Sequence, residues 1–174
     1  CNFNDVFDCD VSINEKAIFE SFLSADPQGR RIRQGSPMWI KLKSDVHKQI
    51  DYLQGTFEET KQTTGISCLS ESDSSLLMWA HYASGYSGCC LIYSTEKTFS
   101  EIKPVIYTDI TFDLFDIDFM DDEMSEAIEE SLRFKHKDWA YENEWRLIQN
   151  EDAGFLNYEV SELVGIIIGE NMSL

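Results

Sequence analysis

Residues 135–148 read KHKDWAYENEWRLI, and this stretch places two acids directly before a predicted strand. The last four residues form the strand, because tryptophan and isoleucine favour extended backbone. Glu142 and Glu144 are two residues apart, so on a strand both would lie on the same face, and on a turn one would orient the other. Tyrosine and tryptophan side chains and the cation Arg146 surround the acids. The stretch is therefore our first candidate for a functional site.

The bulk composition indicates one folded domain that spans residues 1–174. Aromatic residues make up 13% of the chain, which excludes a disordered protein. The net charge of −18 repels phosphate, so nucleic acid and anionic membrane surfaces are not expected partners. The sequence begins at Cys1 and not at methionine, and it stops just after a predicted strand. We expect the native protein to extend beyond the N-terminal end and consider the same for the C-terminal end.

The cysteine pattern indicates free thiols in a reducing cytoplasm. The cysteines are Cys1, Cys9, Cys68, Cys89 and Cys90. Their number is odd and no CxxC pair occurs, so neither a disulfide framework nor a zinc site is predicted. We expect most of these thiols to be buried. The chain has no signal peptide and no apolar run near 18 residues, so neither secretion nor a membrane span is expected.

Hydrophobic periodicity predicts an α+β fold with a mixed, largely antiparallel sheet and helices packed on it. Apolar residues recur every three or four positions over residues 37–57, which is typical of a long amphipathic helix. Shorter helices are expected at residues 14–23, 72–83 and 124–132, and strands at 64–69, 89–93, 105–107, 145–148 and 164–168. Helices and strands do not alternate strictly, which excludes a doubly wound parallel fold. The apolar runs 89–93 and 164–168 predict a buried strand and a central strand, respectively.

Acidic residues are concentrated in residues 109–130, which contain ten Asp and Glu and no Lys or Arg. The simplest interpretation is a solvated loop followed by a helix face. A docking surface for a basic protein partner is the alternative. A calcium loop requires a glycine at its sharp turn, and none is present here, so no metal is expected.

A second group of candidate residues surrounds the predicted helix at 72–83. His81 lies at an apolar edge, where a histidine is usually a core residue held by one hydrogen bond, but it also titrates near neutral pH. Trp79 and Tyr82 are close to it in sequence, and a flexible glycine-rich segment follows. Both interpretations of His81 stay open. No P-loop, GxGxxG, GxSxG or HExxH motif occurs in the chain.

The acids at residues 142 and 144 also have two interpretations. In the first, Arg146 pairs with Glu144 at an exposed strand edge, which contributes little to stability. In the second, a carboxylate in a pocket of Tyr141 and Trp145 binds a sugar hydroxyl and stabilises positive charge at an anomeric carbon.

Four motifs together resemble a bacterial domain-of-unknown-function family, number 2971. They are Phe3-Asn-Asp-Val-Phe-Asp8, Ser67-Cys-Leu-Ser70, Met78-Trp-Ala-His-Tyr-Ala83 with Gly88-Cys89, and Lys135 through Trp139-Ala-Tyr-Glu-Asn-Glu-Trp-Arg146. They follow the order of the family and span most of the chain. Val6 stands where the family usually has proline, and the first strand of the family is not seen in this sequence.

A more distant likeness concerns ADP-ribosyltransferases, whose E-x-E element resembles Glu142-Asn-Glu144. The resemblance implies that the second acid is catalytic and that a serine or tyrosine on a middle strand assists it. Ser67, Ser70 or Tyr82 would take that place. It also implies NAD as the substrate, without a metal.

We therefore expect an ADP-ribosyltransferase-like or NAD-consuming bacterial enzyme, suited to a toxin or phage-defence role, that acts on a nucleotide or a protein acceptor. Glu144 would stabilise the ribose cation and orient the nucleophile, Glu142 would position the acceptor or Glu144 itself, and His81 would bind ribose or phosphate. The expected cofactor-binding residues are Trp79, Tyr82, Ser67, Ser70, Tyr141 and Trp145. The first alternative is a non-catalytic ligand- or protein-recognition module. The second is a metal-dependent nuclease that uses Asp5, Asp8, His81 and Glu144.

Overall fold

The computed structural model describes residues 11–12, 14–24, 32–109, 112–113, 128–149 and 154–173. In chain order its elements are β1 (Val11–Ser12), α1 (Glu15–Ser24), α2 (Pro37–Thr63), β2 (Gly65–Ser70), α3 (Leu76–Tyr82), β3 (Cys89–Tyr93), β4 (Lys103–Pro104), β5 (Ile106–Thr108), β6 (Phe112–Asp113), β7 (Phe134–His136), the 3-10 helix η2 (Lys137–Glu142), β8 (Glu144–Gln149), the 3-10 helix η3 (Val160–Glu162) and β9 (Leu163–Ile168). The strands of the described residues form four small sheets, both antiparallel and parallel, so the α+β class predicted from the sequence is confirmed.

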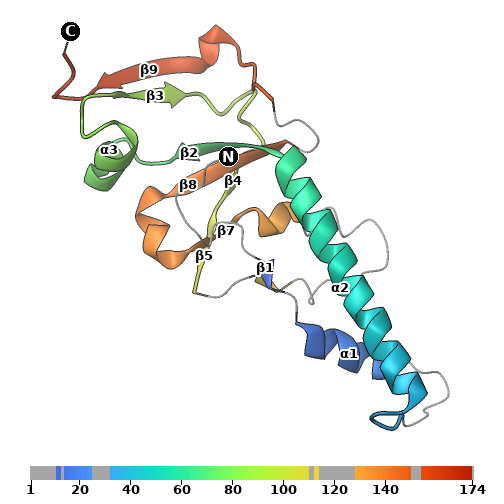
Figure 1. Ribbon diagram of the computed structural model, residues 1–174. Coiled ribbons are helices and arrows are strands. Elements are labelled where there is room, and N and C mark those ends of the chain that lie inside the picture. The colour runs from blue at the N-terminus through green and yellow to red at the C-terminus, as the bar shows by residue number, and fades with distance from the viewer. Residues whose placement is uncertain are drawn as a thin grey trace.

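Strand β8 is the centre of the largest sheet described, with β2 on one side and β4 on the other, both antiparallel to it (Figure 1). The register pairs Ser70 with Glu144 and Leu69 with Trp145. Successive residues of a strand face opposite sides of the sheet. The side chains of Glu144 and Trp145, the first two residues of β8, therefore lie on opposite faces of the sheet.

The ribbon of β3 and β9 corrects two of our predictions. Strand β9 pairs with β3 alone among the described strands, so the prediction of a central strand is wrong. Its alternate residues Val164, Ile166 and Ile168 are 61%, 57% and 55% exposed, and Leu91 on β3 is 44% exposed. The prediction of a buried β3 is therefore also wrong. A β-branched run predicts extended backbone but does not tell how many neighbouring strands cover it.

A close backbone contact fixes the end of β9 against the turn that follows α3. The amide of Gly169 donates to the carbonyl of Gly88 at 2.9 Å, and the amide of Asn171 donates to the carbonyl of Tyr86 at 3.0 Å. A Cβ at Gly169 would lie only 2.1 Å from the oxygen of Tyr86, so glycine is required at this position. The contact holds α3 beside the ribbon.

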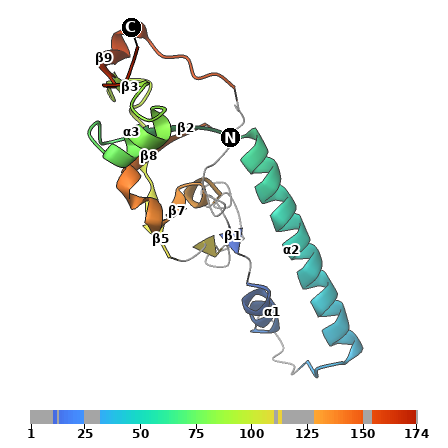
Figure 2. The ribbon, with the colours of Figure 1, turned by 60° about the vertical axis from the view of Figure 1, so that its left-hand side comes forward.

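The long helix α2 confirms the predicted amphipathic stripe. Ser36 caps its N-terminus by accepting a hydrogen bond from the amide of Trp39 at 3.2 Å, and the helix buries Val46, Leu53 and Phe57. It runs away from the sheets, and α1 packs beside its N-terminal half (Figures 1 and 2). The functional candidates therefore lie at the opposite end of the molecule from α1.

Several predictions fall partly outside the described residues. They include Asp5 and Asp8, most of the acidic run 109–130, and the start of the helix expected at 124–132. Cys68 and Cys89 are exposed, so the expectation of mostly buried thiols is wrong for these two. In the part of the chain that the structure describes, no helix has both the length and the apolar character needed to cross a membrane.

Candidate functional site

The two acids of the opening stretch meet in a buried cluster of four charges, the ionic cluster: Lys135, Glu142, Glu144 and Arg146. Nζ of Lys135 lies 2.6 Å from Oε2 of Glu142 and 3.0 Å from Oε2 of Glu144. Nε of Arg146 donates to Oε1 of Glu144 at 2.8 Å, and Nη2 donates to Oε2 at 3.2 Å. These residues are only 1% to 6% exposed. Two cations and two anions thus neutralise one another in the interior.

The backbone between the two acids explains why both reach the same ammonium group. Glu142 ends the 3-10 helix η2 and Glu144 begins β8, so the pair lies neither on one strand nor on one turn. Asn143 between them has a φ of 43°, in the left-handed region, where asparagine is one of the residues best tolerated. This sharp change of direction aims both carboxylates at the side chain of Lys135 on β7.

Backbone and hydroxyl groups complete the hydrogen bonding of the cluster. Nη1 of Arg146 donates to the carbonyl of Leu132 at 2.5 Å, and the amide of Glu144 donates to the hydroxyl of Tyr107 at 2.9 Å. Buried charges are stable only when they are paired and hydrogen-bonded in this way. The predicted pairing of Arg146 with Glu144 is therefore present, but the strand is central and the pair is buried, which corrects the interpretation of a weak, exposed edge pair.

The surroundings of Glu144 keep its carboxylate ionised. Burial alone would raise its pKa, but hydrogen bonds and charge attraction from Arg146, a hydrogen bond from the Cys68 thiol and the charge of Lys135 outweigh burial. Together they lower the pKa of Glu144 from 4.5 to about 2. Glu144 is thus a permanent anion near neutral pH whose oxygens are already engaged by two cations.

A layer of rings on α3 and η2 covers the outer side of the cluster. The hydroxyl of Tyr82 donates to Oε1 of Glu142 at 2.6 Å, and Nδ1 of His81 lies 3.1 Å from the hydroxyl of Tyr141. The rings of His81, Trp139 and Tyr141 lie about 6 Å from one another. These contacts hold α3 against η2, and they leave His81 and Tyr82 largely exposed.

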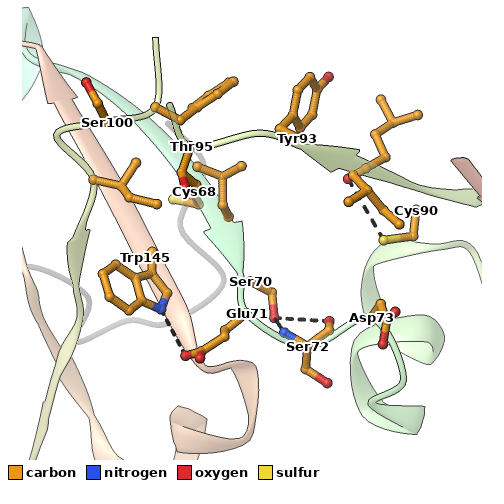
Figure 3. A pocket seen from close by; sticks show the side chains of 15 residues that line it. Cys68, Ser70, Glu71, Ser72, Asp73, Cys90, Tyr93, Thr95, Ser100 and Trp145 are labelled. Carbon is orange, nitrogen blue, oxygen red and sulfur yellow. Dashed lines mark hydrogen bonds between the residues drawn. The ribbon is translucent and has the colours of Figure 1, made fainter. Parts of the chain in front are cut away.

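A cavity of about 710 Å³ opens on the other side of this region, between β2 and β3 (Figure 3). Its fifteen lining residues come from β2 and the loop after it, from β3 and the segment that leads to β4, and from the start of β8. They are Cys68, Leu69, Ser70, Glu71, Ser72, Asp73, Cys90, Leu91, Ile92, Tyr93, Thr95, Phe99, Ser100, Ile102 and Trp145. The cavity thus separates the three-stranded sheet from the β3–β9 ribbon.

The structure places the predicted site residues in different parts of this region. Ser70 and Trp145 line the cavity. Glu142 and Glu144 belong to the ionic cluster, and His81, Tyr82 and Tyr141 lie in the ring layer above it. Trp79 stacks on Tyr86 at 6.1 Å, and Ser67 lies on β2 opposite Leu147. Neither of these two residues lines the cavity, so the predicted residues do not share one cleft.

Sequence reasoning missed several residues of the ionic cluster and of the cavity. Lys135 precedes Glu142 by seven residues, and only its position in a short charged stretch indicated that it binds both carboxylates. Tyr93, Phe99 and Asp73 line the cavity from segments that showed no shared motif. Their convergence depends on how the β3–β9 ribbon packs, which periodicity does not reveal.

Metal binding finds no geometric support in the described ranges. There, no group of three or more His, Cys, Asp or Glu side chains is arranged to hold a metal ion. Asp5 and Asp8, which the nuclease alternative requires, lie outside those ranges.

The lowered pKa of Glu144 predicts a specific loss of stability in acid. A carboxyl whose folded pKa is depressed stabilises the fold above its unfolded pKa of 4.5, and this contribution disappears as the pH falls through about 2. Its size is on the order of 3 kcal/mol. Urea unfolding of wild type and Glu144→Gln should therefore differ most at pH 6 and converge toward pH 2.5. The control Glu58→Gln, at an exposed position of α2, should show no such convergence. A difference between wild type and Glu144→Gln that stays constant with pH would contradict the assignment.

One comparison with known proteins gives a match. The model of a family described as "Protein of unknown function (DUF2971)" matches residues 78–147, which run from α3 into β8 and include the whole ionic cluster. The match covers less than half of the chain and does not include the motifs at residues 3–8 and 67–70. No curated protein and no solved structure matches the chain. The segment 78–147 is therefore similar to the DUF2971 family.

Proposed function

We propose that this protein is a recognition domain that binds a small, ring-bearing molecule in the cavity between β2 and β3. The observation that carries the proposal is the cavity itself: about 710 Å³, walled by aromatic rings and edged by hydroxyl groups. Small-molecule sites typically have volumes of about 300 to 1,000 Å³ and combine apolar walls with a few polar groups. The cavity has both properties.

The aromatic walls stand on different elements. Trp145 comes from β8, and its indole Nε1 donates to Oε2 of Glu71 at 3.3 Å, which fixes the ring. Tyr93 comes from β3 (Figure 3), and its ring centroid lies 5.0 Å from that of Phe99, which is only 4% exposed. Ring surfaces in the lining favour a flat ligand, because stacking adds to the burial of apolar surface.

The polar edge of the cavity is anchored to the ionic cluster. The hydroxyl of Ser70 donates to the carbonyl of Glu142 at 2.6 Å and accepts from the amide of Ser72 at 3.2 Å. The amide of Glu71 donates to the carbonyl of Asn143 at 3.0 Å. These bonds fix the loop after β2 before any ligand arrives, and a site formed in advance loses less entropy on binding.

This proposal predicts that Trp145 is needed for binding and that a tryptophan elsewhere is not. With tryptophol, a neutral indole, as the probe, Trp145→Ala should weaken binding about tenfold because a stacking surface is lost. The matched control is Trp39→Ala on α2, which should bind tryptophol as the wild type does. Ligand-observed NMR titration measures both affinities, and circular dichroism checks that both variants are folded. Equal affinities of the two variants would contradict the proposal.

A second candidate function is NAD consumption by an ADP-ribosyltransferase-like mechanism, in a bacterial toxin or defence setting. One observation favours it: Ser70 on β2 is the direct cross-strand partner of Glu144. The resemblance implies that a middle-strand serine and the second acid of E-x-E act together, and this pairing supports the candidate. Against it, the carboxylate of Glu144 is already held by Arg146 and Lys135, which limits its contact with a ribose. We therefore rank it below recognition.

A nicotinamide-release assay separates the two functions. The recognition proposal predicts that wild type incubated with NAD releases no nicotinamide above the level seen without protein. It also predicts that Glu144→Gln, at a temperature where it is folded, still binds tryptophol. If wild type releases nicotinamide and folded Glu144→Gln does not, the catalytic candidate replaces the recognition proposal.

A further inference from the structure

The charges around the cavity are of one sign. Glu71 and Asp73 are its two carboxylates, and among its fifteen lining residues, all in the described part of the chain, none is Lys, Arg or His. The other polar side chains of the lining are thiols and hydroxyls. An anionic ligand would therefore enter a cavity with no cation to receive it, which costs free energy.

The two carboxylates occupy different positions. Glu71 accepts the indole hydrogen bond of Trp145 and so belongs to the ring wall. Asp73 lies in the loop after β2 and near Cys90 of β3 (Figure 3). Burial, the charge of Asp73 and the neighbouring Cys89 together raise the pKa of the Cys90 thiol, which agrees with this proximity. The cavity thus has a ring wall at Trp145 and a negative end at Asp73.

We infer that the ligand of this cavity is a cation: an amine or quaternary ammonium joined to a flat ring, with the ring against Trp145 and the positive charge near Asp73. The inference rests on the proposed recognition function and adds the charge of the ligand to it. The hydroxyl of Tyr93 stays protonated, because its hydrogen bond with Tyr158, with burial, raises the pKa of Tyr93 to about 12.

The net charge of −18 would attract any cation to some degree, so the test must isolate Asp73 from the field of the whole protein. Three probes share the indole ring and a short tail: tryptamine is a cation, tryptophol is neutral and indole-3-propionate is an anion. Measurements at about 0.15 M salt screen charges beyond roughly 8 Å. Ligand-observed NMR titration of wild type gives the three dissociation constants.

Tryptamine should bind about fivefold more tightly than tryptophol, and indole-3-propionate more weakly than both, because Asp73 is exposed and its pairing energy is modest. Asp73→Asn should remove the advantage of tryptamine without weakening tryptophol. Asp51→Asn on α2 removes the same charge from an exposed site outside the cavity and should preserve the advantage.

Each outcome decides between the two claims. If tryptophol or indole-3-propionate binds wild type at least as tightly as tryptamine, the charge assignment is overturned and the recognition function stands. The charge assignment is also overturned if Asp73→Asn and Asp51→Asn reduce the advantage of tryptamine equally, since the preference then comes from net charge. If none of the three probes binds wild type, the recognition function itself is overturned.

Discussion

The ammonium group of Lys135, held between the carboxylates of Glu142 and Glu144, is the interaction on which this region of the protein depends. It ties β7 to the end of η2 and to the start of β8. Each of the two carboxylates also accepts a second hydrogen bond: Glu142 from the hydroxyl of Tyr82 on α3, and Glu144 from the guanidinium of Arg146. Removing the ammonium group would leave two like charges buried side by side, which a protein interior tolerates poorly.

The cluster also explains why a cavity can persist beside it. The hydroxyl of Ser70 binds Glu142 of η2, and the amide of Glu71 binds Asn143, which directly precedes β8, so one wall of the cavity is part of the rigid sheet. The other wall belongs to the β3–β9 ribbon, which is held at its far end by the contact of Gly169 with the turn after α3. A space between two separately fixed units stays open without internal hydrogen bonds across it.

Local elements were predictable from the sequence, and their convergence was not. The apolar stripe that includes Val46, Leu53 and Phe57 predicted α2, because the residues on the buried face of a helix recur every three or four positions. The residues after Glu144 predicted β8 through their preference for extended backbone. The burial of both acids was not predictable, because it depends on the left-handed conformation of Asn143 and on Lys135 arriving from a neighbouring strand. The spacing of Glu142 and Glu144 alone fits a strand or a turn. In the structure, the first acid ends a 3-10 helix and the second begins a strand.

The candidate site was predicted in part for the same reason. Ser70 and Trp145 were chosen from motifs, and both line the cavity. Asp73, Tyr93 and Phe99 also line it, but they come from segments without a motif that indicates a binding site. The exposure of β3 and β9 escaped prediction because strand propensity reports backbone conformation and does not report how many layers cover a strand. Sequence reasoning therefore singled out the two acids but did not predict that both are buried beside Lys135 and Arg146.

The free energy of unfolding of Lys135→Met, measured by urea denaturation at neutral pH, tests this account most directly. Removing one partner from a buried ionic cluster should cost about 3 to 5 kcal/mol, or abolish the cooperative transition altogether. The control Lys103→Met breaks a half-exposed pair with Glu129 and should cost less than about 1 kcal/mol. If Lys135→Met is as stable as Lys103→Met, the buried cluster does not hold the fold together and the account is wrong.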